Sequence, residues 1–403
     1  MSIHLVRGIH ECSRGVKGPF GHLQCVFSAL GAIVVLTGAS FSTAAQTAAA
    51  AARTGLGFGW GYNHDGELGN GTNIDTNLPV AVKGLTGVKA VSAGTHHCLA
   101  LLSDGKVMAW GDNLYGELGN GTSTNANLPV AVKGLTGVKA VSAGGLFSLA
   151  LLSNGKVKAW GLNTSGQLGN ATFASSDLPV TVKGLTGVSA ISAGGRDSLA
   201  LLSNGTVRAW GSNTVGELGN GSTVADSNVP VAVRSLTGVK AVSAGGFHGL
   251  ALLSGGTVMA WGYNHDGELG NGTNTDSNLP VAVKGLSGVK AISAGGGQGL
   301  ALLRAGAVMA WGYNGEGELG DGTNTSSDVP VAVRGLTGVK AISAGGDDSL
   351  ALLSDAKVMA WGDNLEGQLG NGTNVNSNVP VAVKGLSGVK AVSAGFEHGL
   401  ARK

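Results

Sequence analysis

The stretch GKVMAWGDNLYGELGNG, residues 105–121, recurs in close variants along the chain and decides the fold. A tryptophan marks each copy, at intervals of 50, 50, 50, 51, 50 and 50 residues. The seven tryptophans are Trp60, Trp110, Trp160, Trp210, Trp261, Trp311 and Trp361. A fixed period of this length is typical of a repeat architecture, in which each copy forms one small structural unit. We therefore assign residues 55–403 to one domain of seven units.

Each unit contains four short segments with the composition of β-strands. In one unit the expected strands cover residues 149–152, 157–160, 180–183 and 188–193, with an Asn-Gly pair between the first two. Asn-Gly between two apolar runs is a strong hairpin signal. Both sides of these strands are apolar or small, which indicates sheets that are packed on both faces. Four strands per unit, arranged around an axis, are the design of a β-propeller.

The two ends of the chain predict a closed ring. Residues 55–61 supply a tryptophan strand without the strand that precedes it in other units. Residues 396–401 supply that preceding strand without its partner. Pairing of these ends would remove exposed sheet edges. The sequence thus predicts an all-β, seven-bladed propeller of four-stranded antiparallel blades, closed by its N- and C-terminal strands, although it does not fix which four strands form one blade.

Residues 1–44 have the pattern of a secretory signal peptide. Three basic residues and one acidic residue precede the uncharged run 25–36, and small residues follow it. This run is shorter than the roughly 20 residues of a membrane-spanning helix. We expect cleavage, a secreted or cell-surface product and no stable membrane span, with a retained anchor as the alternative. Residues 45–54 then form an alanine-rich linker.

The overall charge argues against a strongly charged partner. The 403 residues contain 26 basic and 24 acidic side chains, and removal of residues 1–44 leaves 23 of each. The basic positions lack the interleaved aromatic residues of a nucleic-acid surface, so we expect no nucleic acid to bind. Cleavage would also leave Cys98 as the one remaining cysteine, which excludes an intramolecular disulfide.

Charge is nevertheless sorted within each unit. The stretches from tryptophan to proline hold 17 acidic residues and no Lys or Arg, and the segments after Ser-Ala-Gly add four acids and one base. Antiparallel strands place these two connections at the same end of a blade. The other connections and their adjoining strands hold 19 bases and two acids. The sequence therefore predicts a polarised ring whose acidic end could steer a partner, unless duplication alone copied one charge pattern.

Residues that vary within this near-constant frame are the candidates for partner binding. They lie after Ser-Ala-Gly and at the tips of the loops that follow tryptophan. The first group is His96, His97, Phe147, Arg196, Asp197, Phe247, His248, Gln298, Asp347, Asp348, Glu397 and His398. The second group is Asp65, Tyr115, Asp266, Glu316 and Glu366. We predict that both groups form a ring on the acidic face, with a hydrogen bond inside the blade as the alternative role of each histidine.

No pattern in the chain predicts catalysis, a cofactor or a bound metal. The glutamate that recurs in each loop is replaced by Gln167 and Gln368, so a hydrogen bond that braces the loop explains it better than acid–base chemistry. His96 and His97 are strand neighbours that point apart, which argues against joint metal ligation. The loop 63–66 matches a calcium loop only in part. We expect a monomer that is not an enzyme.

The unit closely resembles the regulator-of-chromosome-condensation repeat family. That family's pattern G-x-x-H-x-x-x-L, followed by G-x-V-x-x-W-G-x-N-x-x-G-Q-L-G, is matched at residues 94–101 and 105–119, with Glu117 in place of the Gln, and recurs along the seven units. The histidine of the pattern is kept at His97, His248 and His398 and is replaced by Phe147, Asp197, Gln298 and Asp348. The resemblance covers about residues 55–403 and implies a seven-bladed propeller. The founding members act as exchange factors for a Ras-like GTPase, and Asp and His residues after Ser-Ala-Gly contribute to their binding face. Those members also carry a wedge-like insertion, whereas the units here differ by one residue at most.

Three functions remain open from the sequence. The first is a secreted or cell-surface, non-catalytic propeller that binds a protein through its acidic loops. The second, implied by the resemblance, is a guanine-nucleotide exchange factor-like regulator of a Ras-like GTPase. The third is a secreted inhibitor of an enzyme such as a β-lactamase, which would need aromatic anchors. The aromatic candidates are Tyr62, Tyr115, Phe147, Phe247, Tyr263, Tyr313 and Phe396.

Overall fold

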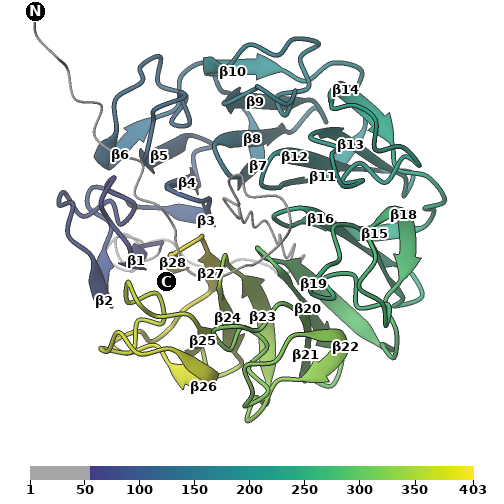
Figure 1. Cartoon of the computed structure of the whole chain (residues 1–403). Helices are drawn as coiled ribbons and strands as arrows, with labels where there is room; N and C mark the ends of the chain where they lie inside the picture. The colour runs from purple at the N-terminus through teal and green to yellow at the C-terminus, as the bar shows by residue number, and fades with distance from the viewer. Residues whose placement is uncertain (1–54) are drawn as a thin grey trace, which may run out of the picture.

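The computed structural model describes residues 55–403 as seven four-stranded antiparallel sheets around a central axis (Figure 1). The predicted all-β, seven-bladed propeller is therefore confirmed. The predicted signal peptide, residues 1–44, and linker, residues 45–54, lie outside the described residues. Within residues 55–403, no helix has the length and apolar character needed to cross a membrane.

Each blade runs outward from the axis through four strands. The innermost strands are β3 (Val88–Ala93), β7 (Val138–Ala143), β11 (Val188–Ala193), β15 (Val239–Ala244), β19 (Val289–Ala294), β23 (Val339–Ala344) and β27 (Ala391–Ala394). The second strands are β4 (His97–Leu102), β8 (Phe147–Leu152), β12 (Asp197–Leu202), β16 (His248–Leu253), β20 (Gln298–Leu303), β24 (Asp348–Leu353) and β28 (His398–Arg402).

The third strand of each blade carries the tryptophan, and the fourth strand forms the outer edge. The third strands are β5 (Val107–Gly111), β9 (Val157–Gly161), β13 (Val207–Gly211), β17 (Val258–Gly262), β21 (Val308–Gly312), β25 (Val358–Gly362) and β1 (Gly57–Gly61). The outer strands are β6 (Ala126–Ala131), β10 (Ser176–Thr181), β14 (Ser227–Ala232), β18 (Ser277–Ala282), β22 (Ser327–Ala332), β26 (Ser377–Ala382) and β2 (Thr76–Ala81).

The two ends of the described chain share one blade, as predicted. Its strand order is β2-β1-β28-β27, so the purple and yellow segments of Figure 1 lie side by side. Strand β1 pairs along β28, with Trp60 opposite Gly399. The Gly55 amide also donates to the Lys403 carbonyl at 2.9 Å. The ring is therefore closed by main-chain hydrogen bonds, which leave no unpaired edge on β1 or β28.

One predicted strand was misplaced. The expected strand 180–183 is observed as Ser176–Thr181, because its end belongs to the loop. The amide of Lys183 donates to the carbonyl of Gly169 at 2.8 Å instead of continuing the ladder. The remaining expected strands of that unit agree with the structure to within two residues.

The hydrophobic core lies between blades rather than inside them. All seven tryptophan side chains are fully buried. Trp210 packs against Leu149, Leu151 and Leu168 of the preceding blade. Its Nε1 also donates to the Gln167 carbonyl of that blade at 2.8 Å. Each tryptophan thus fills an apolar pocket and satisfies a buried carbonyl of the neighbouring blade at the same time.

The seven tryptophan bonds form an unbroken circle. Their acceptors are the carbonyls of Gln368, Glu67, Glu117, Gln167, Glu217, Glu268 and Glu318. The bond from Trp60 to Gln368, at 2.8 Å, spans the joint between the two ends of the chain. A second circle lies nearer the axis, where for example the Ala143 amide donates to Ser92 Oγ at 2.9 Å. Adjacent blades are thus linked by polar contacts at more than one radius.

This packing explains why glycine follows leucine in the repeated motif. Gly119 adopts a φ of 61°, a left-handed conformation that favours glycine. A Cβ atom at Gly119 would lie 2.8 Å from Trp160 Nε1, which is closer than real contacts allow. The glycine is therefore required by the tryptophan of the next blade.

Replacing Trp210 with Phe should lower the free energy of unfolding by about 2 kcal/mol or more. The change removes the shorter of the two hydrogen bonds to the buried Gln167 carbonyl, whose other donor is Ser198 Oγ at 3.1 Å, and leaves part of the pocket unfilled. Urea denaturation followed by fluorescence or circular dichroism measures the effect. As a control, Phe173→Leu alters a side chain that is 52% exposed and should shift stability by less than about 0.5 kcal/mol. Equal stabilities of the two variants would contradict the role assigned to Trp210.

Candidate functional site

The connections between strands divide the ring into two faces. We define the loop face as the end that carries the segments between first and second strands and the long loops between third and fourth strands. The turn face is the opposite end, where Asp104 pairs with Lys106 at 3.1 Å and Asp355 with Lys357 at 2.8 Å. Lys83 and Lys89 are exposed on the strands and turns near that end. The antiparallel order thus sorts acids and bases onto the predicted ends.

Burial reduces the number of charges that the loop face presents. Of its 21 acidic residues, eight are buried: Glu67, Glu117, Asp197, Glu217, Glu268, Glu318, Asp348 and Asp363. Desolvation raises the pKa of Glu117 and of Glu268 to about 8, so their neutral forms dominate at pH 7. The 13 others remain at least partly exposed, against Arg196 as the one base. The face is acidic, but less so than the formal count suggested.

Buried side chains hold each loop in a fixed shape. Glu117 Oε2 accepts a hydrogen bond from the amide of Tyr115 at 2.9 Å. Gln368 makes the same bond to the amide of Glu366, also at 2.9 Å. The predicted loop-bracing role of this position is therefore confirmed, and it explains why Glu and Gln interchange. Both braced amides belong to loop-tip residues, which are thereby presented from a rigid support.

A buried asparagine completes the loop. Asn113 Oδ1 accepts a hydrogen bond from the Leu118 amide at 2.9 Å, and its Nδ2 donates to the Thr122 and Thr124 carbonyls at 2.9 and 3.0 Å. The asparagine stands three residues after tryptophan in every unit. That constancy is a signal in the sequence for a structural role, which the loop geometry now identifies.

The structure corrects the placement of seven candidate binding residues. The second residue of each pair after Ser-Ala-Gly begins a second strand and points between blades, with at most 1% of its surface exposed. These residues are His97, Phe147, Asp197, His248, Gln298, Asp348 and His398. His97 Nε2 lies 2.8 Å from Ser148 Oγ, and Gln298 Nε2 donates to the Asp348 carbonyl at 3.1 Å. Adjacent residues of an extended chain point to opposite sides, so only one residue of each pair can face outward.

The first residue of each pair does reach the loop face. Arg196 is exposed, and His96, Phe247, Asp347 and Glu397 are partly exposed. The candidates at the loop tips are also accessible. Tyr115 is 40% exposed, Glu316 is exposed, and Asp65, Asp266 and Glu366 are partly exposed. The structure thus brings ten of the candidates to one face of the ring.

Several apolar residues of the loops are not among the predicted binding residues. Their side chains lie largely in solvent: Ile74 72%, Leu114 63%, Phe173 52%, Val224 90%, Leu365 64% and Val375 70% exposed. The signal was available, since threonine occupies the place of Ile74 in other units, for example at Thr124 and Thr275. Exposed large apolar side chains often mark contact surfaces.

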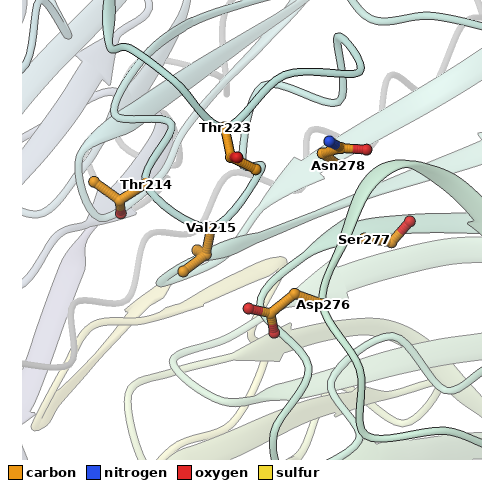
Figure 2. Close-up of a pocket in the computed structure, with 6 residues that line it drawn as sticks. All are labelled: Thr214, Val215, Thr223, Asp276, Ser277 and Asn278. Carbon is orange, nitrogen blue, oxygen red and sulfur yellow. The ribbon is translucent and has the colours of Figure 1, made fainter. Parts of the chain in front are cut away.

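Hollows lie where loops of adjacent blades meet. Thr214, Val215 and Thr223 of one loop lie across a hollow of about 400 Å³ from Asp276, at the end of the next loop, and from Ser277 and Asn278, at the start of β18 (Figure 2). A similar hollow of about 250 Å³ lies between Asp65 and Asn125. Pockets for small molecules are usually enclosed and mainly apolar, whereas the first hollow is lined mainly by hydroxyl, amide and carboxyl groups and the second by a mixture of polar and apolar side chains. The face is better suited to a partner with a broad surface.

A buried cysteine–histidine pair lies between the blades. Cys98 Sγ is 3.1 Å from His398 Nε2, and both side chains are fully buried. Burial raises the pKa of the Cys98 thiol and lowers the pKa of His398 to about 3, so both groups stay neutral. A thiol that stays protonated and shielded from solvent is not an activated nucleophile.

The repeats match known family profiles. The profile of the RCC1-like domain matches residues 139–401, and the regulator of chromosome condensation (RCC1) repeat matches residues 55–101 and 104–151. The chain belongs to the RCC1 repeat family. Its buried tryptophans, braced loops and closing blade are thus features of an RCC1-like propeller.

Solved structures share the fold of this RCC1-like propeller. Prp20p from Saccharomyces cerevisiae is 23% identical, with a TM-score of 0.79 over 87% of this chain and 91% of that chain. Human WBSCR16 is 24% identical, with a TM-score of 0.78 over 87% of this chain and 98% of that chain. Yeast RCC1 (Prp20) bound to Kap60 is 21% identical, with a TM-score of 0.78 over 92% and 95%. The comparison with curated proteins finds no match.

Replacing Asp197 with Asn should stabilise the propeller increasingly as the pH rises. Burial, followed by the charge of Glu217, raises the pKa of Asp197 well above its ordinary value. A carboxyl whose pKa is raised on folding favours the folded state below its unfolded pKa and loses that contribution as pH rises towards the folded pKa. The variant lacks this loss, so its advantage should grow from about pH 4 by up to about 1.4 kcal/mol per pH unit.

Urea denaturation of both proteins between pH 4 and pH 8 measures this advantage. Asp177→Asn, at a partly exposed position, controls for the loss of one carboxyl from the same face. A constant difference between Asp197→Asn and the unaltered protein across this range would show that Asp197 does not carry the buried, shifted carboxyl.

Proposed function

We propose that this RCC1-like propeller is a non-catalytic protein that binds a protein partner on its loop face. The observation that carries the proposal is the contrast between the frame of each loop, meaning the buried residues that hold its shape, and the residues at the loop tips. The frame is buried and hydrogen-bonded, as at Glu117 and Asn113, whereas the tips vary and include exposed apolar groups such as Leu114 and Leu365. A preorganised surface loses little conformational entropy when it binds, so its contacts contribute more fully to affinity.

The charged and aromatic groups of this face indicate the kind of partner that it suits. Its exposed acids outnumber its bases, which favours a partner with a basic contact surface. Two aromatic clusters lie on it: Tyr62 and His64 at 4.5 Å between ring centroids, and Phe247 and Tyr263 at 6.3 Å. Aromatic side chains are frequent anchors of protein interfaces.

We further propose that the partner is met outside the cell or at its surface. The support is the sequence pattern of residues 1–44, where a basic segment, an apolar run and small residues follow one another. If the protein inhibits a secreted enzyme, it would bind that enzyme with the same face. The captured partner would then be an enzyme, which would identify this role.

A regulator of a Ras-like GTPase is the alternative that family membership supports. The structure of the relative Prp20p was described together with its binding to Gsp1p and histones. Within residues 55–403, the long loops between third and fourth strands offer no wedge-like insertion, because each joins its strands with 14 residues, or 15 in the β13–β14 loop. Binding by the loop face therefore accounts for more of the structure than nucleotide exchange does.

Reversing charge on the loop face should strongly reduce partner capture. The test variant combines Asp266→Lys, Glu316→Lys and Glu366→Lys, all at accessible loop tips. Affinity capture from secretions of the source organism, followed by quantitative mass spectrometry, should show at least about tenfold less of the partner, because opposite charge steers association and like charge opposes it.

The matched control reverses three exposed lysines of the innermost strands near the turn face, with Lys89→Glu, Lys139→Glu and Lys240→Glu. This control should retain the partner. Capture that is unchanged by the loop-face variant, or lost only with the control, would contradict the proposal. Accelerated nucleotide release from a Ras-like GTPase in the presence of the unaltered protein would instead support the alternative.

A further inference from the structure

Two carboxylates and one imidazole converge at the joint between the closing blade and its neighbour. Asp65 and Glu67 lie in the loop after β1, and His96 lies between β3 and β4 of the adjacent blade. One oxygen of each carboxylate and one ring nitrogen of His96 all lie within 4.8 Å of one another. Within residues 55–403 this is the one group of three such side chains close enough to share an ion.

Two buried atoms in this group lack hydrogen-bond partners. Glu67 is fully buried, and its Oε2 accepts a bond from the Asp65 amide at 3.0 Å. Its Oε1 and the Nδ1 of His96 have no hydrogen-bond partner among the described residues. The two atoms face each other at 3.5 Å, beyond the usual length of an N–H···O bond. A buried carboxylate oxygen left in this way is costly, and a cation would satisfy it.

The spacing is that of ligands around an ion. Two ligand atoms bound tetrahedrally at about 2.1 Å from one zinc ion lie roughly 3.4 Å apart. The distance between Glu67 Oε1 and His96 Nδ1 is close to this value. Asp65 is held in place as well, because its Oδ1 accepts a hydrogen bond from Asn125 Nδ2 at 2.8 Å. Support of this kind orients metal ligands and leaves the other oxygen of Asp65 available.

The surroundings also favour a cation. The carboxyl groups of Glu67, Glu397 and Asp112 lie near enough to His96 to act on its ring electrostatically. These acids produce a negative potential at the imidazole. The ring of Tyr62 packs with its centroid 5.6 Å from that of His96 and covers one side of the group. The site is thus partly shielded from solvent and attractive to positive charge.

We propose that Asp65, Glu67 and His96 bind one divalent transition-metal ion of the Zn²⁺ class and so clip the closing blade to its neighbour. An imidazole beside two carboxylates suits zinc better than calcium or magnesium, which take oxygen ligands almost entirely. Three protein ligands leave one coordination position open to solvent. The sequence predicted no bound metal because His96 and His97 were expected to point apart, and the structure shows that they do. The additional ligands come instead from the preceding loop.

The chain contains its own comparison site. Residues 263–274 repeat the sequence of residues 62–73 without a change, and the Asp266 amide again donates to Glu268 Oε2, at 2.9 Å. Gly297 stands there in place of His96. Glu117 and Glu318 also have an Oε1 without a hydrogen-bond partner among residues 55–403, but Leu146 and Asp347 occupy the position of His96 beside them. The histidine therefore distinguishes this joint from the other six.

The test uses the full chain, stripped with EDTA and titrated with ZnCl₂ by calorimetry. Two variants copy residues that the repeats already contain: His96→Gly follows Gly297, and Glu67→Gln follows Gln167 and Gln368. Each should weaken Zn²⁺ binding at this site at least about tenfold, since each removes a ligand. Zn²⁺ should raise the thermal unfolding temperature of the unaltered protein more than that of either variant, because it binds across the joint.

A gain of binding completes the test. Gly297→His is combined with Tyr313→Asp for two reasons. A Cβ at Gly297 would lie 3.0 Å from the Cβ of Tyr313. In the unit that contains His96, Asp112 stands at the position equivalent to Tyr313. This variant should bind one more Zn²⁺ than the unaltered chain. Equal affinity and stoichiometry for the unaltered chain, His96→Gly and Glu67→Gln would overturn the proposal, whether or not other histidines bind zinc.

Discussion

The hydrogen bond from each tryptophan indole to a carbonyl of the preceding blade is the contact on which the rest of the structure depends. The bond occurs seven times, and the bond from Trp60 to Gln368 closes the circle. The carbonyl that accepts it belongs to the residue whose side chain braces the loop tip, as with Glu117. Ring closure and the shape of the loop face therefore rest on the same residue in every unit. A change to the frame affects both together.

The period of the tryptophans was enough to predict seven blades, and the complementary ends at residues 55–61 and 396–401 were enough to predict closure. Both features can be read from the order of residues along the chain, and neither depends on the direction in which a side chain points. The same holds for the interchange of Glu117 with Gln167, which indicated a hydrogen bond rather than a charge.

The candidate site was harder to predict because it depends on direction and burial. His96 and His97 have the same chemistry, but one reaches the loop face and the other lies between blades. The start of strand β4 decides this, and no repeat pattern reveals it. The charge of the face depends likewise on which carboxyls are desolvated, and the group of Asp65, Glu67 and His96 forms only where two different units meet. A comparison of the units position by position does not show which residues of two neighbouring units contact each other.

The central claim is that the closing blade is as firmly held as the other six. Hydrogen–deuterium exchange of the full chain, followed by mass spectrometry, tests it most directly. The tryptophan circle and the pairing of β1 with β28 predict that amides of these two strands exchange as slowly as those of β12 and β13. Exchange that is much faster in β1 and β28 than in the other blades would show that the ring opens at this joint and would contradict the account.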